Sequence, residues 1–317
     1  MSEPVNDQAS EHRSGFAALV GRPNAGKSTL TNALVGAKVA ITSNKPQTTR
    51  HAIRGIVTRP DAQLVLVDTP GLHRPRTVLG QRLNDVVRET LSQVDVVGFC
   101  VPANEKVGPG DAFIAAELTE LRKRRRRAGV IAIATKADLV ERDRLAAHLL
   151  ALQGLGDWDD IVPCSALAPP GQDYPDVTLV ADLMVRHLPP GPALYPDGEL
   201  TDEPEAVLVA EVVREAALEG VRDELPHSLA VVVEEMTQRE GRPVDRPLLD
   251  IRVELYVERP SQKAIVIGRG GSRLREVGAR ARAGIEALLG QQVYLDLHVR
   301  VAKDWQRDPK ALARLGF

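Results

Sequence analysis

The chain has 317 residues, of which 43% are hydrophobic and 26% are charged, and its formal net charge is -2. This length suits two domains of about 100 to 200 residues each. No apolar run approaches the roughly 18 residues that span a bilayer, so the composition excludes an integral membrane protein. Residues 1–14 contain no apolar stretch, and we expect a disordered tail there rather than a signal peptide. The expected location is therefore the cytoplasm.

Apolar runs alternate with amphipathic stretches through the first 190 residues. The amphipathic stretches, such as 27–35 and 81–92, favour helices. The runs are apolar throughout, which is typical of strands buried on both faces: FAALVG, LVLVDTPG, VDVVGFCVP, VIAIATKAD and DIVPCSA. This alternation predicts an α/β fold with a doubly wound sheet, in which ligands bind at the carboxyl ends of the strands.

A phosphate-binding loop follows the first strand. Its sequence, GRPNAGKS, has the pattern of Gly, four residues and Gly-Lys-Ser between a strand and a helix. Glycines let backbone N–H groups converge on phosphate oxygens, Lys27 supplies a point charge and the Ser28 hydroxyl can ligate magnesium. The residues predicted to bind nucleotide here are Gly21, Asn24, Ala25, Gly26, Lys27, Ser28 and Thr29.

Two further segments suit a triphosphate with its magnesium ion. DTPG ends a strand, so Asp68 can hold the metal through water while the Gly71 N–H binds the γ-phosphate. In PQTTR, upstream, either Thr48 or Thr49 could close over the metal, and we favour Thr49. The predicted metal ligands are Ser28, Thr49 and Asp68. The predicted catalytic set is Lys27, Thr49, Asp68, Gly71 and Asn24.

The run ATKAD occupies the position where a GTPase reads its base. The Asp138 carboxylate can accept hydrogen bonds from the ring N–H and amino group of guanine, a donor pair that adenine lacks. The Lys136 stem can lie on the base face, and CSA brings Ser165 and the N–H of Ala166 to the guanine carbonyl. Thr135 stands where asparagine is usual. Because its hydroxyl is too short to reach both the base edge and the phosphate loop, we expect nucleotide binding weaker by about 1 kcal/mol, with guanine selectivity kept.

These motifs together resemble the Era family of GTPases. The resemblance rests on GRPNAGKS, PQTTR, DTPGLH, TKAD and CSA, and it continues through ELPHSLAVVVEE at 224–235, KAIVIGRGG at 263–271 and KDWQRDPKALARLGF at the end of the chain. It implies a GTPase domain followed by a type II KH domain. It also implies GTP, GDP and Mg2+ as ligands, binding to the 3' end of small-subunit ribosomal RNA, and a role in late maturation of the small ribosomal subunit as a monomer.

The resemblance bears on the hydrolysis mechanism as well. The glutamine that positions water in many GTPases is replaced by Leu72. Relatives with an apolar residue here hydrolyse GTP slowly, often with potassium held partly by an asparagine of the phosphate loop. Asn24 matches that asparagine, so we predict potassium-stimulated hydrolysis, with a purely loop-shaping role for Asn24 as the alternative.

The second half reads as an RNA-binding domain. Residues 200–258 carry 6 basic and 15 acidic side chains, whereas residues 259–317 carry 12 and 5, so a basic end follows an acidic segment. A segment rich in Pro, Gly and acidic residues separates the halves. We expect a GTPase domain at 15–190, a linker at 191–203 and a KH domain with its extension at 204–317.

The GRGG sequence supplies the Gly-x-x-Gly loop with which KH domains clamp RNA backbone. The predicted RNA-binding residues are Gly268, Arg269, Gly270, Gly271, Arg273 and Arg275, and Arg280 and Arg282 extend the basic helix. Aromatic residues make up only 3% of the chain, so phosphate contacts should dominate over base stacking.

Some alternatives stay open at this stage. Trp305 suits a core position better than a base-stacking one, and the basic run at 122–127 is either a solvated helix end or a ribosomal contact. The rival function is an RNA-binding module in which GTP is only a structural ligand. Peripheral association with the inner face of the cell membrane is another alternative, although no basic amphipathic helix with exposed aromatic residues supports it.

Overall fold

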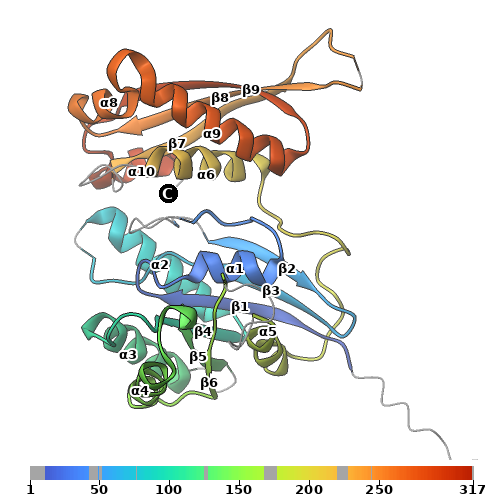
Figure 1. Cartoon of the computed structure of the whole chain (residues 1–317), viewed down its shortest axis with the longest axis vertical. Helices are drawn as coiled ribbons and strands as arrows, with labels where there is room; N and C mark the ends of the chain where they lie inside the picture. Colours follow the sequence, from blue (N-terminus) through green and yellow to red (C-terminus); the bar gives the residue numbers. More distant parts are fainter. Residues whose placement is uncertain are drawn as a thin grey trace, which may run out of the picture.

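Two β-sheets divide the chain into a larger and a smaller domain, stacked one above the other (Figure 1). The computed structural model describes residues 11–42, 49, 52–75, 77–124, 128–167, 177–219, 228–243 and 245–315. Every helix within these ranges is too short or too polar to cross a membrane.

The larger domain is a six-stranded sheet in the order β2-β3-β1-β4-β5-β6. All neighbouring strands are parallel except β2, which pairs antiparallel with β3. Its elements are β1 (Arg13–Gly21), α1 (Lys27–Val35), β2 (Ile53–Thr58), β3 (Ala62–Asp68), α2 (Val78–Gln93), β4 (Val96–Pro102), α3 (Pro109–Arg124), β5 (Gly129–Thr135), α4 (Arg142–Gln153), β6 (Asp160–Pro163) and α5 (Val177–Arg186), with a 3-10 turn η1 (Ala137–Leu139) after β5.

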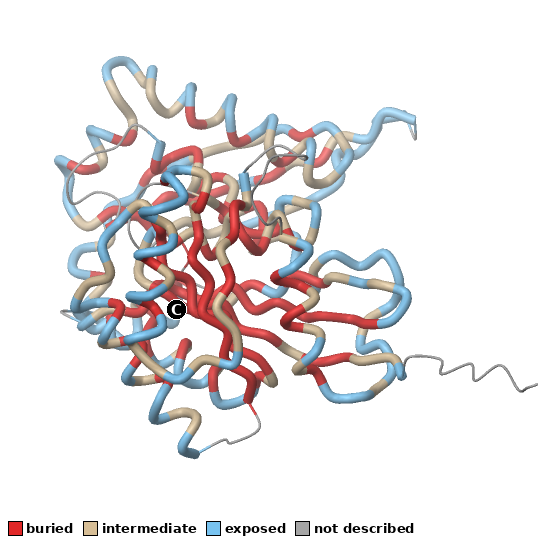
Figure 2. The backbone as a smooth tube through the Cα atoms, turned by 60° about the horizontal axis from the view of Figure 1, so that its bottom comes forward, coloured by how far each residue is buried: buried red, intermediate tan, exposed pale blue. Residues whose placement is uncertain are grey.

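Helices cover both faces of this sheet, and the strand sequences show why. Every residue of β3, β4 and β5 is buried, as apolar runs without alternation predict. One apolar cluster joins the sheet to α1 and α5, and a second joins its other face to α2, α3 and α4. Figure 2 shows the buried positions concentrated along the strands, with exposed positions on the outer helix faces. Because β1, β3 and β5 run parallel, this doubly wound arrangement places their carboxyl ends side by side at the same end of the sheet.

The smaller domain is a three-stranded sheet in the order β7-β8-β9, with β7 antiparallel and β9 parallel to β8. Its elements are α6 (Glu205–Leu218), β7 (Ala230–Gln238), β8 (Leu248–Val257), α8 (Pro260–Ile267), η2 (Arg269–Gly271), α9 (Ser272–Leu289), β9 (Gln292–Val301), η3 (Trp305–Arg307) and α10 (Pro309–Arg314). Alternate residues of β8 pack with α6 and α9 into one apolar core. The order of one helix, two strands, two helices and a strand is the order expected from the sequence.

The segment between the domains runs along the β2 edge of the larger sheet. Buried Gln63 holds it: its side-chain oxygen accepts from the N–H groups of Leu194 and Tyr195 at 2.6 and 2.8 Å, and its nitrogen donates to the Tyr195 carbonyl at 2.9 Å. Further along, the Ile56 N–H donates to the Leu200 carbonyl at 2.9 Å. The linker is therefore attached to the larger domain along its length.

An apolar interface joins the domains at α2. Trp305 is fully buried and packs with Leu79 and Leu83 of α2 and with Leu312 and Leu315 near the end of the chain. Its indole nitrogen donates to the Ser228 carbonyl at 3.1 Å. The core position predicted for Trp305 is confirmed, and the core in question lies between the domains.

The start of the first strand differs from the expectation. β1 begins at Arg13, so Arg13 and Ser14 belong to the sheet and not to the expected tail, and they pair with Ala62 and Gln63 of β3. Their polar side chains conceal the strand from a reading of apolar runs. Residues 1–10 lie outside the described residues.

Candidate functional site: a nucleotide pocket at the sheet edge and a glycine loop in the smaller domain

The phosphate loop connects β1 to α1 in a conformation that favours phosphate binding. Asn24 and Gly26 have φ values of 63° and 86°, and α1 begins directly after Gly26, so the N–H groups of its first turn face the loop. The buried Lys27 ammonium donates to the carbonyls of Gly21 and Arg22 at 3.3 and 3.0 Å. Burial lowers the pKa of Lys27, and the nearby Asp68 carboxylate opposes that shift. The cation is held where phosphates would meet the loop.

Three oxygen-bearing side chains from distant segments meet beside this loop. The Ser28 hydroxyl lies 2.6 Å from an Asp68 carboxylate oxygen and 2.9 Å from the Thr49 hydroxyl, which lies 3.3 Å from the same carboxylate oxygen. Asp68 is fully buried, and its other oxygen has no hydrogen-bond partner among the described residues. Burial raises the pKa of Asp68 to about 6, although Lys27 partly offsets the shift.

This oxygen cluster suits a small divalent cation. Hard oxygen ligands are those that Mg2+ takes in nucleotide sites, and a buried carboxylate with an unpaired oxygen gains most from a cation. The structure brings together the three predicted metal ligands, Ser28, Thr49 and Asp68. Thr48, the alternative to Thr49, lies outside the described residues.

The turn after β3 lies against the phosphate loop. A Cβ on Gly71 would lie 2.7 Å from the backbone nitrogen of Pro23, so only glycine permits this approach. The next residue, Leu72, donates its N–H to the Gly21 carbonyl at 3.1 Å, and its side chain is buried in the core beneath α2. Leu72 therefore has no polar group with which to position a water.

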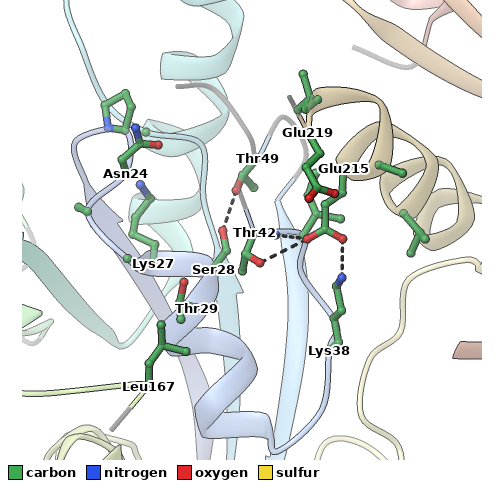
Figure 3. Close-up of a pocket in the computed structure, with 18 of the residues that line it drawn as sticks. Asn24, Lys27, Ser28, Thr29, Lys38, Thr42, Thr49, Leu167, Glu215 and Glu219 are labelled. Carbon is green, nitrogen blue, oxygen red and sulfur yellow. Dashed lines mark hydrogen bonds and ion pairs between the residues drawn. The ribbon is translucent and has the colours of Figure 1, made fainter. Parts of the chain in front are cut away.

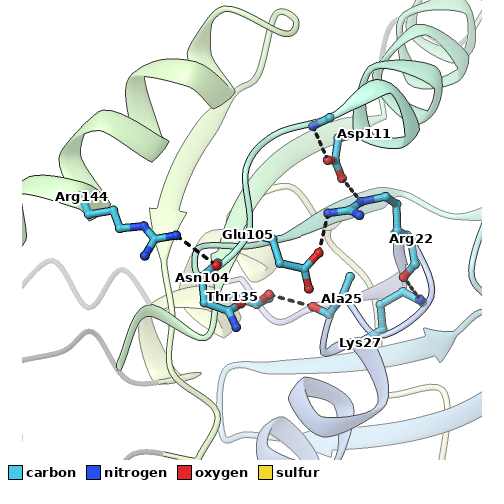
Figure 4. Close-up of polar contacts among 9 residues, drawn as sticks. Arg22, Ala25, Lys27, Asn104, Glu105, Asp111, Thr135 and Arg144 are labelled. Atoms are coloured by element: carbon cyan, nitrogen blue, oxygen red, sulfur yellow. Dashed lines mark hydrogen bonds and ion pairs between the residues drawn. The ribbon is translucent and has the colours of Figure 1, made fainter. Parts of the chain in front are cut away.

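Thr135 links the base-reading loop to the phosphate loop. Its hydroxyl donates to the Ala25 carbonyl at 2.7 Å, and the residue is only 5% exposed (Figure 4). Of the two contacts expected from an asparagine at this position, the threonine makes the one with the phosphate loop.

Asp138 is held by the segment after β6. The Ser165 hydroxyl donates to one Asp138 carboxylate oxygen at 2.6 Å, and the Ala137 N–H donates to the Cys164 carbonyl at 3.2 Å. Lys136 has a left-handed φ of 56° and lines the pocket. The sequence predicted these two loops as neighbours, and the hydrogen bonds show how the second orients the carboxylate of the first.

Arg22 is a site residue that sequence reasoning missed. Its guanidinium donates to Asp111 at 2.7 Å and to Glu105 at 3.1 Å, which ties the phosphate loop to the start of α3 (Figure 4). Asp111 is fully buried and also accepts from the Gly108 N–H at 2.9 Å. Arg22 is 83 and 89 residues from Glu105 and Asp111 in the sequence, so only the basic residue inside the loop indicated that a pairing could exist.

A cavity of about 770 Å3 extends from the phosphate loop to the smaller domain. Figure 3 shows Asn24, Lys27 and Ser28 on one side, and Glu215 of α6 and the next residue after this helix, Glu219, on the other. Leu167, which is 79% exposed, lines the cavity beside the base-reading loops. The second domain thus forms part of the pocket wall.

The GRGG loop separates α8 from α9 in the smaller domain. Gly268, Gly270 and Gly271 have φ values of 73°, 58° and 77°, a region that side chains rarely adopt. A Cβ on Gly270 or Gly271 would meet nothing within 4 Å, so this surface is open, and the Arg269 side chain is exposed there. The loop offers backbone to an approaching ligand.

The arginines after the loop have different partners. Arg273 donates to the carbonyls of Ala217 and Glu219 at the end of α6, at 3.3 and 2.8 Å. Arg275 donates to the Gly270 carbonyl at 3.1 Å, and Arg280 pairs with Glu276 and Glu219. Arg273 and Arg280 thus support the packing of α9 on α6, a use that the sequence reading did not anticipate.

The fold and the site define a P-loop GTPase domain joined to a KH-type domain, and comparison with known proteins agrees. Residues 16–136 match the model of the 50S ribosome-binding GTPase family, and residues 224–306 match the KH domain model. The chain is 65% identical over 324 residues to GTPase Era of Streptomyces coelicolor, covering 99% of both chains, and 62% identical over 308 residues to GTPase Era of Mycobacterium avium, covering 97% of this chain and 99% of the relative.

Solved structures extend the comparison. A crystal structure of Era in complex with MgGDPNP and nucleotides 1506–1542 of 16S ribosomal RNA has a TM-score of 0.88 at 35% identity, covering 96% of this chain and 99% of that one. A variant of Aquifex aeolicus Era bound to GDP.AlF4- has the same score, identity and coverage. The chain belongs to the Era family of GTPases, as its motifs indicated.

Proposed function

We propose that this chain binds GTP and GDP with Mg2+ in the pocket at the sheet edge and hydrolyses GTP. The convergence of Ser28, Thr49 and Asp68 beside the phosphate loop carries this proposal. When bound, Mg2+ neutralises charge on the β- and γ-phosphate oxygens. Lys27 adds its charge to the same oxygens, and the Gly71 N–H is placed to bind the γ-phosphate, so that its loss frees the turn leading to α2.

Guanine selectivity is assigned to Asp138. Its carboxylate accepts from the guanine ring N–H and amino group, and Ser165 keeps the carboxylate oriented. We assign Lys136 to one face of the base and the Ala166 N–H to the guanine carbonyl oxygen. Thr135 contributes through the phosphate loop rather than through the base.

Hydrolysis is proposed to be slow and stimulated by potassium. Leu72 is buried and apolar, so the chain lacks a side chain at this position that could orient water. Asn24 lines the pocket from the phosphate loop and is the candidate ligand for K+ beside the phosphates. Turnover measured at equal ionic strength in potassium and in sodium tests this, because equal rates would remove the potassium role.

We further propose that the KH domain binds the 3' end of 16S ribosomal RNA and assists maturation of the small ribosomal subunit. The related Era in complex with nucleotides 1506–1542 of 16S ribosomal RNA and the open GRGG loop of this chain support this. Glycine backbone at this loop lets phosphates approach the start of α9, while Arg269 supplies charge.

The RNA site is tested with an oligonucleotide of the 16S ribosomal RNA 3' end. Arg269→Glu reverses the exposed charge of the loop. Gly271→Asp adds a carboxylate with no atom within 4 Å of its Cβ, at a φ of 77° that side chains rarely adopt, so both its charge and its backbone strain act on the loop. Arg246→Glu, at an exposed residue before β8, is the matched charge control. We expect each loop variant to bind the oligonucleotide at least about tenfold more weakly, because phosphate contacts supply electrostatic binding energy whatever the base sequence. The control should bind it as tightly as the parent chain. Equal binding by all variants would place the RNA elsewhere.

The chain is proposed to act as a monomer. Contact with the membrane surface stays an alternative to purely soluble action. Co-sedimentation with vesicles containing anionic lipids would reveal it, and sedimentation velocity would report the oligomeric state.

A further inference from the structure

The end of α6 faces the nucleotide pocket. Cavity-lining residues from the smaller domain are Val212, Glu215, Ala216, Leu218 and Glu219 of this region, together with Arg280 and Gly284 of α9. The KH domain therefore meets the nucleotide site through a helix that also packs against the helix that follows the GRGG loop. Among the residues of this wall, Glu215 makes direct polar contacts with the GTPase domain.

Glu215 binds the segment that follows α1, residues 38–42. One carboxylate oxygen accepts from the Thr42 backbone N–H at 3.0 Å and from the Thr42 hydroxyl at 3.3 Å, and the other pairs with the Lys38 ammonium (Figure 3). The Glu215 side chain is 20% exposed, so these contacts are partly shielded from solvent. Charge-assisted hydrogen bonds of this kind are stronger than neutral ones.

The same segment is fixed from its other side by α1. The Asn32 side-chain oxygen accepts from the N–H groups of Val39 and Ala40 at 3.0 and 2.8 Å, and its nitrogen donates to the Ala40 carbonyl at 2.7 Å. Residues 38–42 are thus held between α1 and α6. Lys38 and Thr42 line the same cavity as Thr49, whose hydroxyl lies in the oxygen cluster with Ser28 and Asp68. The Glu215 contacts coexist with the arrangement that suits a magnesium-bound triphosphate.

The opposite end of this connection reaches the RNA loop. Arg273, in the first turn of α9, donates to the last carbonyls of α6, and a Cβ on Gly268 would lie only 2.7 Å from the Arg273 Cβ. The GRGG loop therefore packs against Arg273, which holds the end of α6. That end of the helix is close in sequence to Glu215. A ligand that shifts this loop would act on the helix that carries Glu215.

We propose that Glu215 is the positioning residue through which the KH domain recognises the triphosphate arrangement of the GTPase domain. It holds Thr42 and Lys38, which line the same cavity as Thr49 and the phosphate loop, and so favours the arrangement that suits a magnesium-bound triphosphate. The proposal rests on the proposed function, and it assigns to one carboxylate of α6 the coupling between nucleotide and RNA. By linkage, if RNA binding raises the affinity for GTP through this contact, GTP raises the affinity for RNA by the same factor.

The test compares Glu215→Ala with the parent chain for binding of a non-hydrolysable GTP analogue and of GDP, both with Mg2+. We expect affinity for the analogue to fall about tenfold, because charge-assisted hydrogen bonds are lost, and affinity for GDP to stay within about twofold. Glu205→Ala removes the same charge from an exposed position in the first turn of α6 and should change neither. An unchanged ratio for Glu215→Ala, or a loss confined to GDP, would overturn the proposal.

A double-mutant cycle with Lys38→Ala, and RNA binding, complete the test. If the contact is direct, the two substitutions together should cost less than the product of their separate effects. Multiplicative effects would overturn the direct contact.

The 16S ribosomal RNA oligonucleotide should bind the parent more tightly with the GTP analogue than with GDP, and Glu215→Ala should lose that difference; an undiminished difference would place the coupling elsewhere. A parent chain that binds no guanine nucleotide would instead contradict the proposed function.

Discussion

Replacing Thr135 by Val measures how much the base-reading loop stabilises the phosphate loop. Valine keeps the shape of threonine but removes the donor to the Ala25 carbonyl, a bond of 2.7 Å at a position that is 5% exposed. A net hydrogen bond is worth about 1 kcal/mol, and leaving the carbonyl unsatisfied raises the cost to at most about 3 kcal/mol. If the bond preorganises the loop for phosphate, part of this cost appears as weaker binding, and a loss of about 1 to 2 kcal/mol corresponds to roughly 5- to 30-fold.

The assay is calorimetric titration of GDP and ADP into the parent chain, Thr135→Val and Thr119→Val. Thr119 is the matched control, since its hydroxyl donates to the Ala115 carbonyl at 2.9 Å within α3. We expect weaker GDP binding by Thr135→Val alone, with discrimination against ADP unchanged. Parent-like affinity would show that the loop is ordered without this bond. Altered base preference would show that Thr135 touches the base, contrary to the reasoning.

Other consequences follow from the same contacts. Because an added Cβ at Gly71 would lie 2.7 Å from the Pro23 nitrogen, Gly71→Ala should slow single-turnover GTP hydrolysis by about a hundredfold, and parent-like rates would contradict the assigned contact. Arg22→Gln leaves the buried Asp111 carboxylate without its cation and should lower the free energy of unfolding by about 1 to 3 kcal/mol in urea titrations; no loss would show that the pairing is not stabilising. Burial lowers the pKa of His148 below its ordinary 6.5, so the unfolded chain binds this proton first and the free energy of unfolding falls as pH drops through 6.5. His148→Asn should lose less stability over the same pH range. An NMR titration that finds a pKa of 6.5 or above for His148 would contradict this.

The sequence predicted those parts of the site that depend on short stretches of chain. A phosphate loop is recognisable because the strand, the glycines and the lysine are contiguous. The position of Asp138 and Ser165 at one edge follows from parallel strands, whose carboxyl ends must meet. The strands themselves were visible because burial on both faces demands unbroken apolar runs, whereas Arg13 and Ser14 were missed because their side chains are polar.

Contacts between distant segments could not be predicted from short stretches of sequence. Nothing near Glu215 in the sequence indicates that its carboxylate faces Thr42, since that contact depends on how two domains pack. Arg273 has a structural contact that its position in the sequence does not reveal. Its place beside GRGG suggested phosphate binding, but the carbonyls at the end of α6 need donors, and the arginine supplies one there. A basic residue near a binding loop can therefore also support the packing of the fold.

Nucleotide competition tests the central claim most directly. GTP, GDP, ATP and XTP would compete against a fluorescent GDP analogue on the parent chain and on Asp138→Asn. The account predicts that guanine nucleotides compete best on the parent by at least about a hundredfold, because unmatched donors and acceptors exclude the others. On the variant, preference should pass to XTP, whose carbonyl replaces the amino group of guanine. Equal competition by all four nucleotides on the parent, or an unchanged preference in the variant, would contradict the assignment of this chain as a guanine-specific GTPase.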